Sequence, residues 1–179
     1  MDRRRGLRAS TAMERELWSD GITSWADLRQ RPHPRLTPAK LKSLDGQITQ
    51  SLERLGDADP VYFAGLLASG EHWRLLREFR DAIAYLDIET TGLSGAGDHI
   101  TTIALYDGRQ VRHFVHGLNL DDFGTAIAEY RLLVTYNGKC FDVPFIERTL
   151  GVRLPQPHVD MRYVQRRSQG HRASPGHGP

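Results

Sequence analysis

The chain has 179 residues, of which 39% are hydrophobic and 26% charged, a composition that fits one medium globular domain with a small helical addition and excludes an intrinsically disordered protein. Its one cysteine, Cys140, excludes a disulfide framework and a cysteine-rich zinc site. Because no apolar run is long enough to cross a bilayer, and none follows the arginines of the first ten residues, we expect a soluble, cytoplasmic protein with no membrane partner.

The charges are unevenly distributed along the chain. The formal net charge is +2, yet residues 80–160 hold 11 acidic against 7 basic residues, a local net charge of −4, while arginines gather near both ends. Such a pattern fits a nucleic-acid enzyme whose acids hold metal ions. It fits an ordinary solvated surface equally well, so charge alone leaves both readings open.

Residues 1–80 carry mainly helical signals. A helix is predicted from Thr11 until Gly21, and a second, short one is stopped by the prolines that follow residue 31. Thr37 and Pro38 indicate the start of a longer helix with a leucine-rich stripe, which Gly56 ends. Further helical sequence begins at Asp59. We therefore interpret residues 1–80 as a small helical N-terminal region.

After residue 80 the pattern changes to alternating strands and helices. A strand is predicted over residues 82–89, followed by two strands joined at Asp107-Gly108, a strong hairpin signal. A helix led by Asp121 and Asp122 is predicted over residues 120–131, then a short strand from residue 132 and a helix over residues 141–150 that Gly151 stops. The order predicts an α/β fold whose mixed sheet combines an antiparallel hairpin with parallel strands.

Three acids fall where strands end in this scheme. Asp87 and Glu89 lie two residues apart in the first strand, so both project from the same face. Adjacent carboxylates repel, and a hard divalent cation such as Mg²⁺ or Mn²⁺ relieves that repulsion. Asp142 begins the helix after the strand at residue 132, and parallel pairing of the two strands would bring it to the same edge of the sheet. A cap of that helix is the alternative role for Asp142.

The sequence segments around these acids resemble motifs of a known protein family. The segments DIETTGL and NGKCFDVPFI are similar to two motifs of the DEDD, or DnaQ-like, 3′–5′ exonucleases, which have a ribonuclease H-like fold. The longer segments EHWRLLREFRDAIAYLDIETTGL and HVDMRYV resemble the YprB-type ribonuclease H-like subgroup most, and the resemblance extends from about residue 61 to residue 164.

The resemblance implies two-metal hydrolysis of phosphodiesters at the 3′ ends of single-stranded DNA or RNA. Asp87, Glu89 and Asp142 would be the catalytic and metal-binding residues for Mg²⁺ or Mn²⁺. The residues that it assigns to the substrate are Thr90, Thr91, Gly92, Leu93 and Asn137. Leu93 would act as a wedge against the last base, with a core contact as the alternative. Asn137 would orient the metal-side loop, with a turn role as the alternative.

One family feature is missing from the chain. The family carries a fourth carboxylate on a last helix, close to a His or Tyr base, but no Asp or Glu follows Asp160 here. We therefore expect a C-terminally incomplete ribonuclease H-like exonuclease domain over residues 81–167 and a disordered tail over residues 168–179. Three readings remain open: an active metal-dependent 3′–5′ exonuclease, a degenerate or truncated member that still binds metal or nucleic acid weakly, and a non-catalytic helical interaction module. The oligomeric state is unknown.

Overall fold

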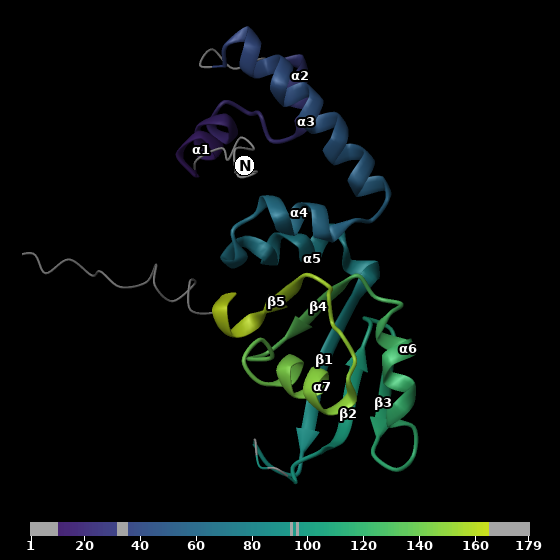
Figure 1. Ribbon diagram of the computed structural model, residues 1–179. Helices are drawn as coiled ribbons and strands as arrows, with labels where there is room; N and C mark the ends of the chain where they lie inside the picture. Colours follow the sequence, from purple (N-terminus) through teal and green to yellow (C-terminus); the bar gives the residue numbers. More distant parts are fainter. Residues whose placement is uncertain (1–10, 32–35, 94, 96, 165–179) are drawn as a thin grey trace, which may run out of the picture. The chain divides into compact units, whose positions relative to one another are not determined.

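The computed structural model describes residues 11–31, 36–93, 95 and 97–164 (Figure 1). The chain forms two compact units, residues 1–57 and residues 58–179, and each is described here by itself. The tail that is predicted to be disordered, residues 168–179, lies outside the described residues. Within the described part, no helix is both long and apolar enough to span a membrane.

The first unit is helical, as the sequence predicts. It contains α1 (Thr11–Ser19), α2 (Trp25–Gln30) and α3 (Pro38–Gly56). The side chain of Ser24 accepts a hydrogen bond from the N–H of Asp27, whose carboxylate accepts the N–H of Ser24 in return, so a capping box starts α2. Thr37 caps α3 through the N–H of Lys40.

The second unit opens with four short helical segments that lead into a sheet. They are α4 (Pro60–Leu66), the 3₁₀ helix η1 (Ser69–Arg74), α5 (Leu75–Glu78) and the 3₁₀ helix η2 (Arg80–Ala82). All four belong to the same compact unit as the sheet, because the division between the units falls after residue 57.

Five strands form one mixed sheet. They are β1 (Ile83–Thr90), β2 (Ile100–Tyr106), β3 (Val111–Val115), β4 (Leu132–Thr135) and β5 (His158–Asp160), in the order β3-β2-β1-β4-β5. The pairs β1–β2 and β2–β3 are antiparallel, whereas β1–β4 and β4–β5 are parallel. Helices flank the sheet, and the predicted α/β fold is confirmed. The three-residue strand β5 was not predicted.

The β2–β3 hairpin turns where the sequence indicates. Tyr106 pairs with Val111, and the carboxylate of Asp107 accepts the N–H groups of Arg109 and Gln110 at 2.8 and 2.9 Å. Gly108 has a φ of +91°, a backbone conformation that side-chain-bearing residues rarely adopt. The turn therefore sets the register of the antiparallel half of the sheet.

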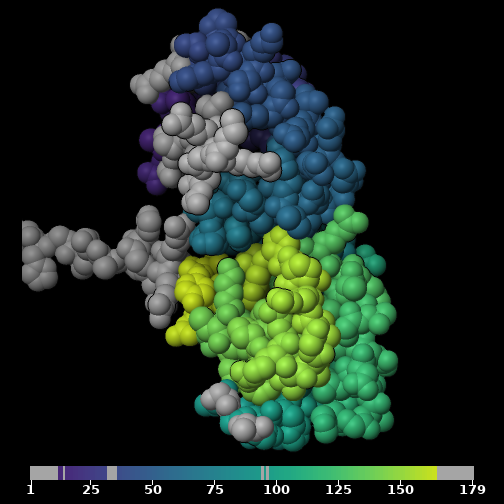
Figure 2. All heavy atoms as spheres, viewed as in Figure 1, coloured from purple at the N-terminus to yellow at the C-terminus, as the bar shows by residue number. Residues whose placement is uncertain are grey.

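Two helical segments cover one face of the sheet. The 3₁₀ helix η3 (Leu120–Asp122) leads into α6 (Phe123–Ile127), and α7 (Asp142–Leu150) ends at Gly151, whose φ is +66°. Figure 2 shows α7 and the segment that follows it, in yellow-green, beside α6 and β3, in green. The helix predicted over residues 120–131 is thus shorter than expected. Asp121 and Asp122, which were predicted to lead it, lie in η3, and neither η3 nor α6 has a side-chain cap.

The main core lies between this face and these helices. It contains alternate residues of β1 together with side chains of β2, β3, α6 and α7: Ala84, Leu86, Ile88, Ile103, Leu105, Phe114, Phe123, Ile127, Phe145 and Ile146. Because side chains alternate along a strand, Tyr85, Asp87 and Glu89 of β1 project from the opposite face, where they are exposed.

Candidate active site

Strand β1 brings two acids to the exposed face of the sheet. Asp87 and Glu89 lie opposite Ala104 and Thr102 of β2, and both are exposed. The register of the pair shifts between Glu89 and Thr90, so the strand is irregular directly after the second acid. The structure therefore confirms the prediction that both carboxylates share a face at the carboxyl end of β1.

A third acid begins α7, the helix that follows β4 in the chain. Tyr85 of β1 pairs with Val134 of β4 in parallel, so the two strands end at the same edge of the sheet. The chain leaves β4, turns through residues 136–141 and begins α7 at Asp142, which is only 4% exposed. The prediction that the three acids lie at one edge of the sheet depends on parallel pairing of β1 with β4, and this pairing is present.

Asp142 does not cap its helix. No side-chain hydrogen bond caps α7, and among the described residues the Oδ2 atom of Asp142 has no hydrogen-bond partner although it is fully buried. An unpaired buried carboxylate oxygen is costly, and in native proteins it calls for a specific explanation. The capping alternative for Asp142 is excluded, and a ligand role is compatible with the unused oxygen.

The electrostatics connect Asp142 with its neighbours. Burial, together with the negative charges of Asp87 and Asp160, raises the pKa of Asp142 to about 6. The charge of Asp87 therefore acts on Asp142. Glu89 is not among the charges that raise this pKa, so the structure brings together two of the three predicted acids electrostatically, and the ligand role of Glu89 stays a prediction.

Asp160 holds the loop between β4 and α7. It is 3% exposed, its Oδ1 accepts the N–H groups of Asn137 and Arg162 at 2.9 and 3.0 Å, and its Oδ2 accepts the N–H of Lys139 at 3.0 Å. Pairing of Asp160 with Thr135 across β4 and β5 brings it under this loop. Both oxygens are thus engaged by the backbone. Sequence reasoning identified its motif but missed this role.

The same loop has a strained but well-supported turn. Asn137 has a φ of +66°, and its side-chain oxygen accepts a hydrogen bond from the guanidinium of Arg162. Both roles considered for Asn137, a turn residue and a residue that orients the loop, are therefore compatible with its geometry. A Cβ atom on Gly138 would lie 2.4 Å from the Oγ1 of Thr135, so only glycine fits there.

His158 supports this turn from β5. Its Nε2 lies 2.7 Å from the Oγ1 of Thr135, which also accepts the N–H of Gly138 at 3.1 Å. Burial, and the positive charge of Lys139, lower the pKa of His158 to about 4, so the imidazole is neutral at pH 7. The Thr135 hydroxyl is then able to donate to Nε2 while it accepts from Gly138.

The turn after β1, which the resemblance assigns to substrate contacts, uses some of its polar groups within the protein. The N–H of Thr91 donates to the carbonyl of His99 at 3.0 Å, and the hydroxyl of Thr90 donates to the carbonyl of Gly92 at 2.7 Å. A Cβ atom on Gly92 would lie 2.5 Å from the carboxylate of Asp98. The N–H of Thr91 is therefore engaged within the hairpin, and the glycine accommodates Asp98. Direct substrate contacts by Thr90, Thr91 and Gly92 stay predictions.

Leu93 follows this turn and is 78% exposed. The alternative of a core contact is thereby excluded. A large apolar side chain held in solvent beside an acidic strand end is available to contact a ligand, and the predicted wedge role of Leu93 stays a prediction.

The acids are not arranged as a ready-made metal centre. In the described part of the chain, no three His, Cys, Asp or Glu side chains form a group that could hold a metal ion as they stand. Carboxylates repel one another when no cation lies between them, and the exposed side chains of Asp87 and Glu89 are free to turn apart. Binding of a metal ion by all three acids together would therefore require a change of side-chain conformation.

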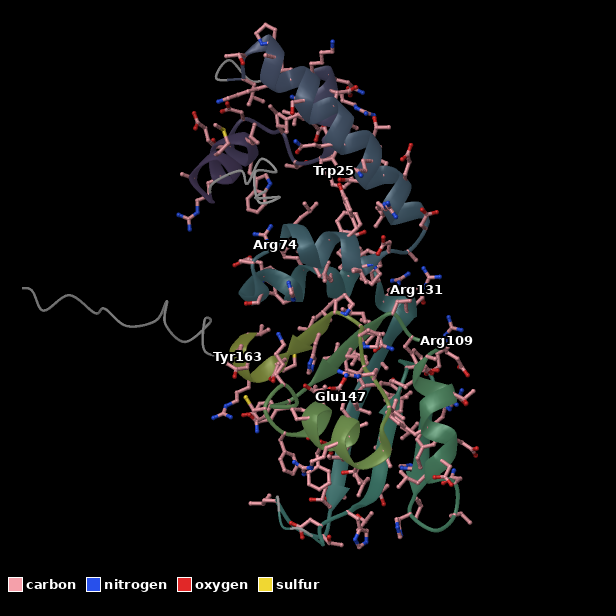
Figure 3. All side chains as sticks on the ribbon, viewed as in Figure 1. Trp25, Arg74, Arg109, Arg131, Glu147 and Tyr163 are labelled. Carbon is pink, nitrogen blue, oxygen red and sulfur yellow. The ribbon has the colours of Figure 1, made fainter. Side chains whose placement is uncertain are left out.

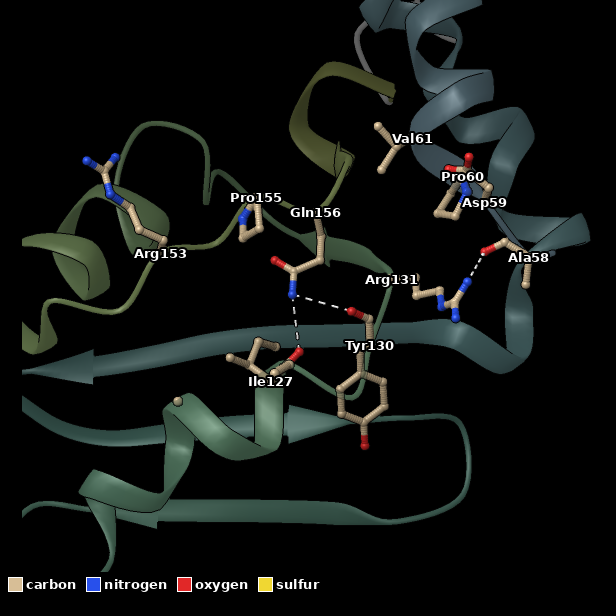
Figure 4. A pocket seen from close by; sticks show the side chains of 12 residues that line it. Ala58, Asp59, Pro60, Val61, Ile127, Tyr130, Arg131, Arg153, Pro155 and Gln156 are labelled. Carbon is tan, nitrogen blue, oxygen red and sulfur yellow. Dashed lines mark hydrogen bonds between the residues drawn. The ribbon is translucent and has the colours of Figure 1, made fainter. Parts of the chain in front are cut away.

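Two cavities of the second unit lie beside β1 or at its start. One, of about 470 Å³, is lined by Asp87 and by tyrosines of the open sheet face. The other, of about 450 Å³, is lined by residues 58–61, by α6 and the segment after it (Gly124, Ile127, Ala128, Tyr130 and Arg131), and by Arg153, Pro155 and Gln156 (Figure 4). There the amide of Gln156 donates to the carbonyls of Ile127 and Tyr130, and Arg131 donates to the carbonyl of Ala58. Arg131 and Arg109 lie at the end of the sheet away from the turn after β1 (Figure 3). The first cavity alone includes a predicted site residue.

The sequence of the second unit matches a known protein superfamily. Residues 84–174, just over half of the chain, match the sequence model of the RNase_H superfamily. The chain belongs to the RNase H superfamily. The matched region contains Asp87, Glu89, Asp142 and Asp160, and membership of the superfamily supports a nuclease-type function in general.

Comparison with characterised protein sequences gives no significant match. Among solved structures, the crystal structure of the Aedes aegypti Nibbler EXO domain aligns with a TM-score of 0.41 and 13% sequence identity. The alignment covers 60% of this chain and 57% of that chain, so the superfamily member described here spans less than two thirds of the Nibbler domain. A likeness of this degree does not define the function.

Proposed function

We propose that the chain is a metal-dependent 3′–5′ exonuclease-type hydrolase of single-stranded DNA or RNA, of the DEDD class and nearest to the YprB-type subgroup, with weak activity. The observation that carries the proposal is the buried, unpartnered Oδ2 of Asp142 beside the charge of Asp87, because no structural role accounts for it. Membership of the RNase H superfamily and the motifs around these acids support the same reaction class.

The donor set fits a hard divalent cation. Asp142 offers an unused carboxylate oxygen, and Asp87 and Glu89 offer exposed carboxylates on the adjoining strand. Mg²⁺ retains several waters and is commonly held by one or two carboxylates together with substrate phosphates, so a group of three prearranged ligands is not required. When bound, such an ion would neutralise charge at the scissile phosphate and lower the pKa of a coordinated water.

The chain's own residues would position the substrate and the acids. Asp160 and Arg162 hold the loop that leads to Asp142, and thereby fix the start of α7. Leu93, exposed after β1, would contact the last base of a 3′ end. In the sequence given, no acid follows Asp160, so the resemblance supplies no fourth carboxylate to share a second metal ion. Slow hydrolysis is the expected behaviour of this chain.

The test is digestion of 5′-labelled single strands, with free or blocked 3′ ends, in Mg²⁺, in Mn²⁺ and in EDTA. We expect slow shortening from the free 3′ end, faster in Mn²⁺ and absent in EDTA. Asp87→Asn would abolish it, and Asp121→Asn, at an exposed acid outside the site, would not. Equal shortening by wild type and Asp87→Asn in a purified sample would contradict the proposal.

A second candidate is a catalytically degenerate nucleic-acid-binding or helical interaction module. It is favoured by the absence, in the described residues, of a group of three acids that could hold a metal, and by the engagement of both Asp160 oxygens with backbone N–H groups. Binding of single strands without any hydrolysis in Mn²⁺ would select the binding module. Failure to bind any oligonucleotide would select the interaction module.

A further inference from the structure

Two tyrosines form an aromatic pair on the open face of the sheet. Tyr85 of β1 lies opposite Tyr106 of β2, and their ring centroids are 5.8 Å apart with 38° between the ring planes. The two residues are 40% and 42% exposed, although both strands bury their alternate side chains in the core. Such large, partly wet aromatic surfaces are typical of ligand contacts.

The pair lines the cavity that contains Asp87. Its volume is about 470 Å³, within the range of about 300–1,000 Å³ that is usual for ligand sites. A third tyrosine, Tyr136, which is 62% exposed, lines it from the end of β4. The other lining residues are mostly apolar: Leu76, Leu86, Ala104, Val134, Thr135 and Met161.

The opening is confined to one part of this sheet face. Ile83, Leu132 and Val134, which share the face, are buried, and so are Leu75 and Phe79 of the helical segments before β1. Beyond Tyr85 the face is open and carries the two acids of β1. The aromatic pair is therefore continuous with the candidate active site and is not an isolated surface feature.

We propose that this cavity binds a base of a single-stranded nucleic acid, stacked on Tyr85 and Tyr106, next to the phosphodiester that Asp87 faces. This inference rests on the proposed function and adds the place where the strand lies. No Lys or Arg lines the cavity, so its chemistry suits a neutral planar base and disfavours a phosphate within it. Stacking is open to every base, and we therefore expect little sequence preference.

Binding is measured without hydrolysis, by fluorescence anisotropy of short labelled single strands of DNA and RNA in EDTA. Loss of one stacked base typically weakens binding by about 5- to 150-fold, and we expect an effect of this size for the double variant Tyr85→Ala/Tyr106→Ala. Tyr85→Phe/Tyr106→Phe keeps both rings and would bind as wild type does. Trp18→Ala removes an exposed aromatic side chain of the first unit and is the matched control.

A second arm uses the wild-type protein alone, so it does not depend on the folding of a variant. A strand with abasic sites keeps the phosphates but has no bases, and we expect it to bind wild type as weakly as an intact strand binds the alanine double variant. Equal affinity of wild type for intact and abasic strands, or no binding of either, would overturn the inference. So would a mononucleotide that binds as tightly as the strand.

The outcome for the inference is separable from that for the proposed function. Base-dependent binding through the tyrosines without any hydrolysis in Mn²⁺ supports the stacking site and rejects the exonuclease. Hydrolysis that depends on Asp87, together with unchanged binding by the alanine double variant, supports the exonuclease and rejects the stacking site.

Discussion

The ionised form of Asp142 is unfavourable in the folded, metal-free chain. The folded-state pKa is about 6, whereas the ordinary value of the carboxyl is 3.8, so the folded state holds the proton more tightly than the unfolded state does. The stabilisation that this group contributes is complete below about pH 3.8 and is lost as the pH rises through about 6. A carboxyl that weakens folding at neutral pH is the behaviour expected of a functional residue.

We therefore predict that Asp142→Asn stabilises the metal-free protein at pH 7.5. A shift of one pKa unit corresponds to about 1.4 kcal/mol, and the new amide is itself imperfectly paired, so the free energy of unfolding is expected to rise by about 1–3 kcal/mol. At pH 4 the gain disappears. Urea denaturation at both pH values measures the effect.

Asp121→Asn, at an exposed acid of η3, is the matched control and is expected to change stability by less than about 0.5 kcal/mol at either pH. Calorimetric titration of Mn²⁺ into the same proteins completes the test, because Asp142→Asn removes the unused oxygen. An asparagine variant that is less stable than wild type at pH 7.5, or that binds Mn²⁺ unchanged, would contradict the interpretation of Asp142.

At the scale of elements, the β4–α7 loop depends on β5. Three backbone N–H groups converge on the carboxylate of Asp160, which replaces the hydrogen bonds that an irregular loop lacks. The charge of Asp160 also contributes to the raised pKa of Asp142. One side chain thus both shapes the loop and sets the electrostatics at the start of α7.

Asp160→Asn is predicted to change both the stability of the β4–α7 loop and the pKa of Asp142. Hydrogen bonds to a charged group are worth about 1.5–3 kcal/mol, and an amide offers only one oxygen to the three donors, so a loss of stability of about 2–4 kcal/mol is expected. Loss of the charge lowers the pKa of Asp142, which NMR titration of its carboxyl detects. Asp122→Asn serves as the control. An unchanged Asp142 titration in a folded variant would refute the electrostatic link.

The elements that were predictable from the sequence are those with a local signal. The alternation of buried and exposed residues predicts β1 and the shared face of Asp87 and Glu89. The dipeptide Asp107-Gly108 predicts the hairpin turn, and Gly151 predicts the end of α7. Strand β5 has three residues, too few for a period to show. Aspartates before α6 suggest caps, but the 3₁₀ turn there leaves them outside the helix without a capping bond.

The candidate site could be predicted from the sequence only to the extent that the order of the strands could be predicted. Parallel pairing of β1 with β4 follows from the α/β pattern, and it brings Asp142 towards Asp87. The role of Asp160 depends on β5 lying beside β4, and the Tyr85–Tyr106 pair depends on the register of the hairpin. These are contacts between distant segments, which residue type and spacing do not specify.

At the scale of the whole molecule, the chain divides after residue 57. Among the described residues, the main hydrophobic core of the second unit draws on residues 84–154, and the five strands lie within residues 83–160. We therefore predict that residues 58–179 fold alone and bind Mn²⁺ with an affinity within about twofold of that of the full chain, because every predicted metal ligand belongs to this unit. Calorimetry and circular dichroism check both statements.

The same shortened protein separates the contribution of the N-terminal charge. Residues 1–57 include the arginine-rich start of the chain, and each phosphate contact that is lost lowers the salt dependence of binding. We expect weaker binding of single strands with a shallower dependence on salt concentration, measured by anisotropy. An identical salt slope for both proteins would show that the first unit makes no phosphate contact.

The strand order β3-β2-β1-β4-β5 also has a kinetic consequence. Strands β1, β2 and β3 are neighbours in sequence, and such local pairings close quickly. Strand β4 joins β1, and β5 joins β4, through long crossovers whose closure is entropically slow. Asp87 lies in the early half, and Asp142 and Asp160 lie in the late half. Their mutual repulsion therefore arises only in the last stage of folding, where we expect divalent ions to speed refolding and protonation of Asp142 to have the same effect.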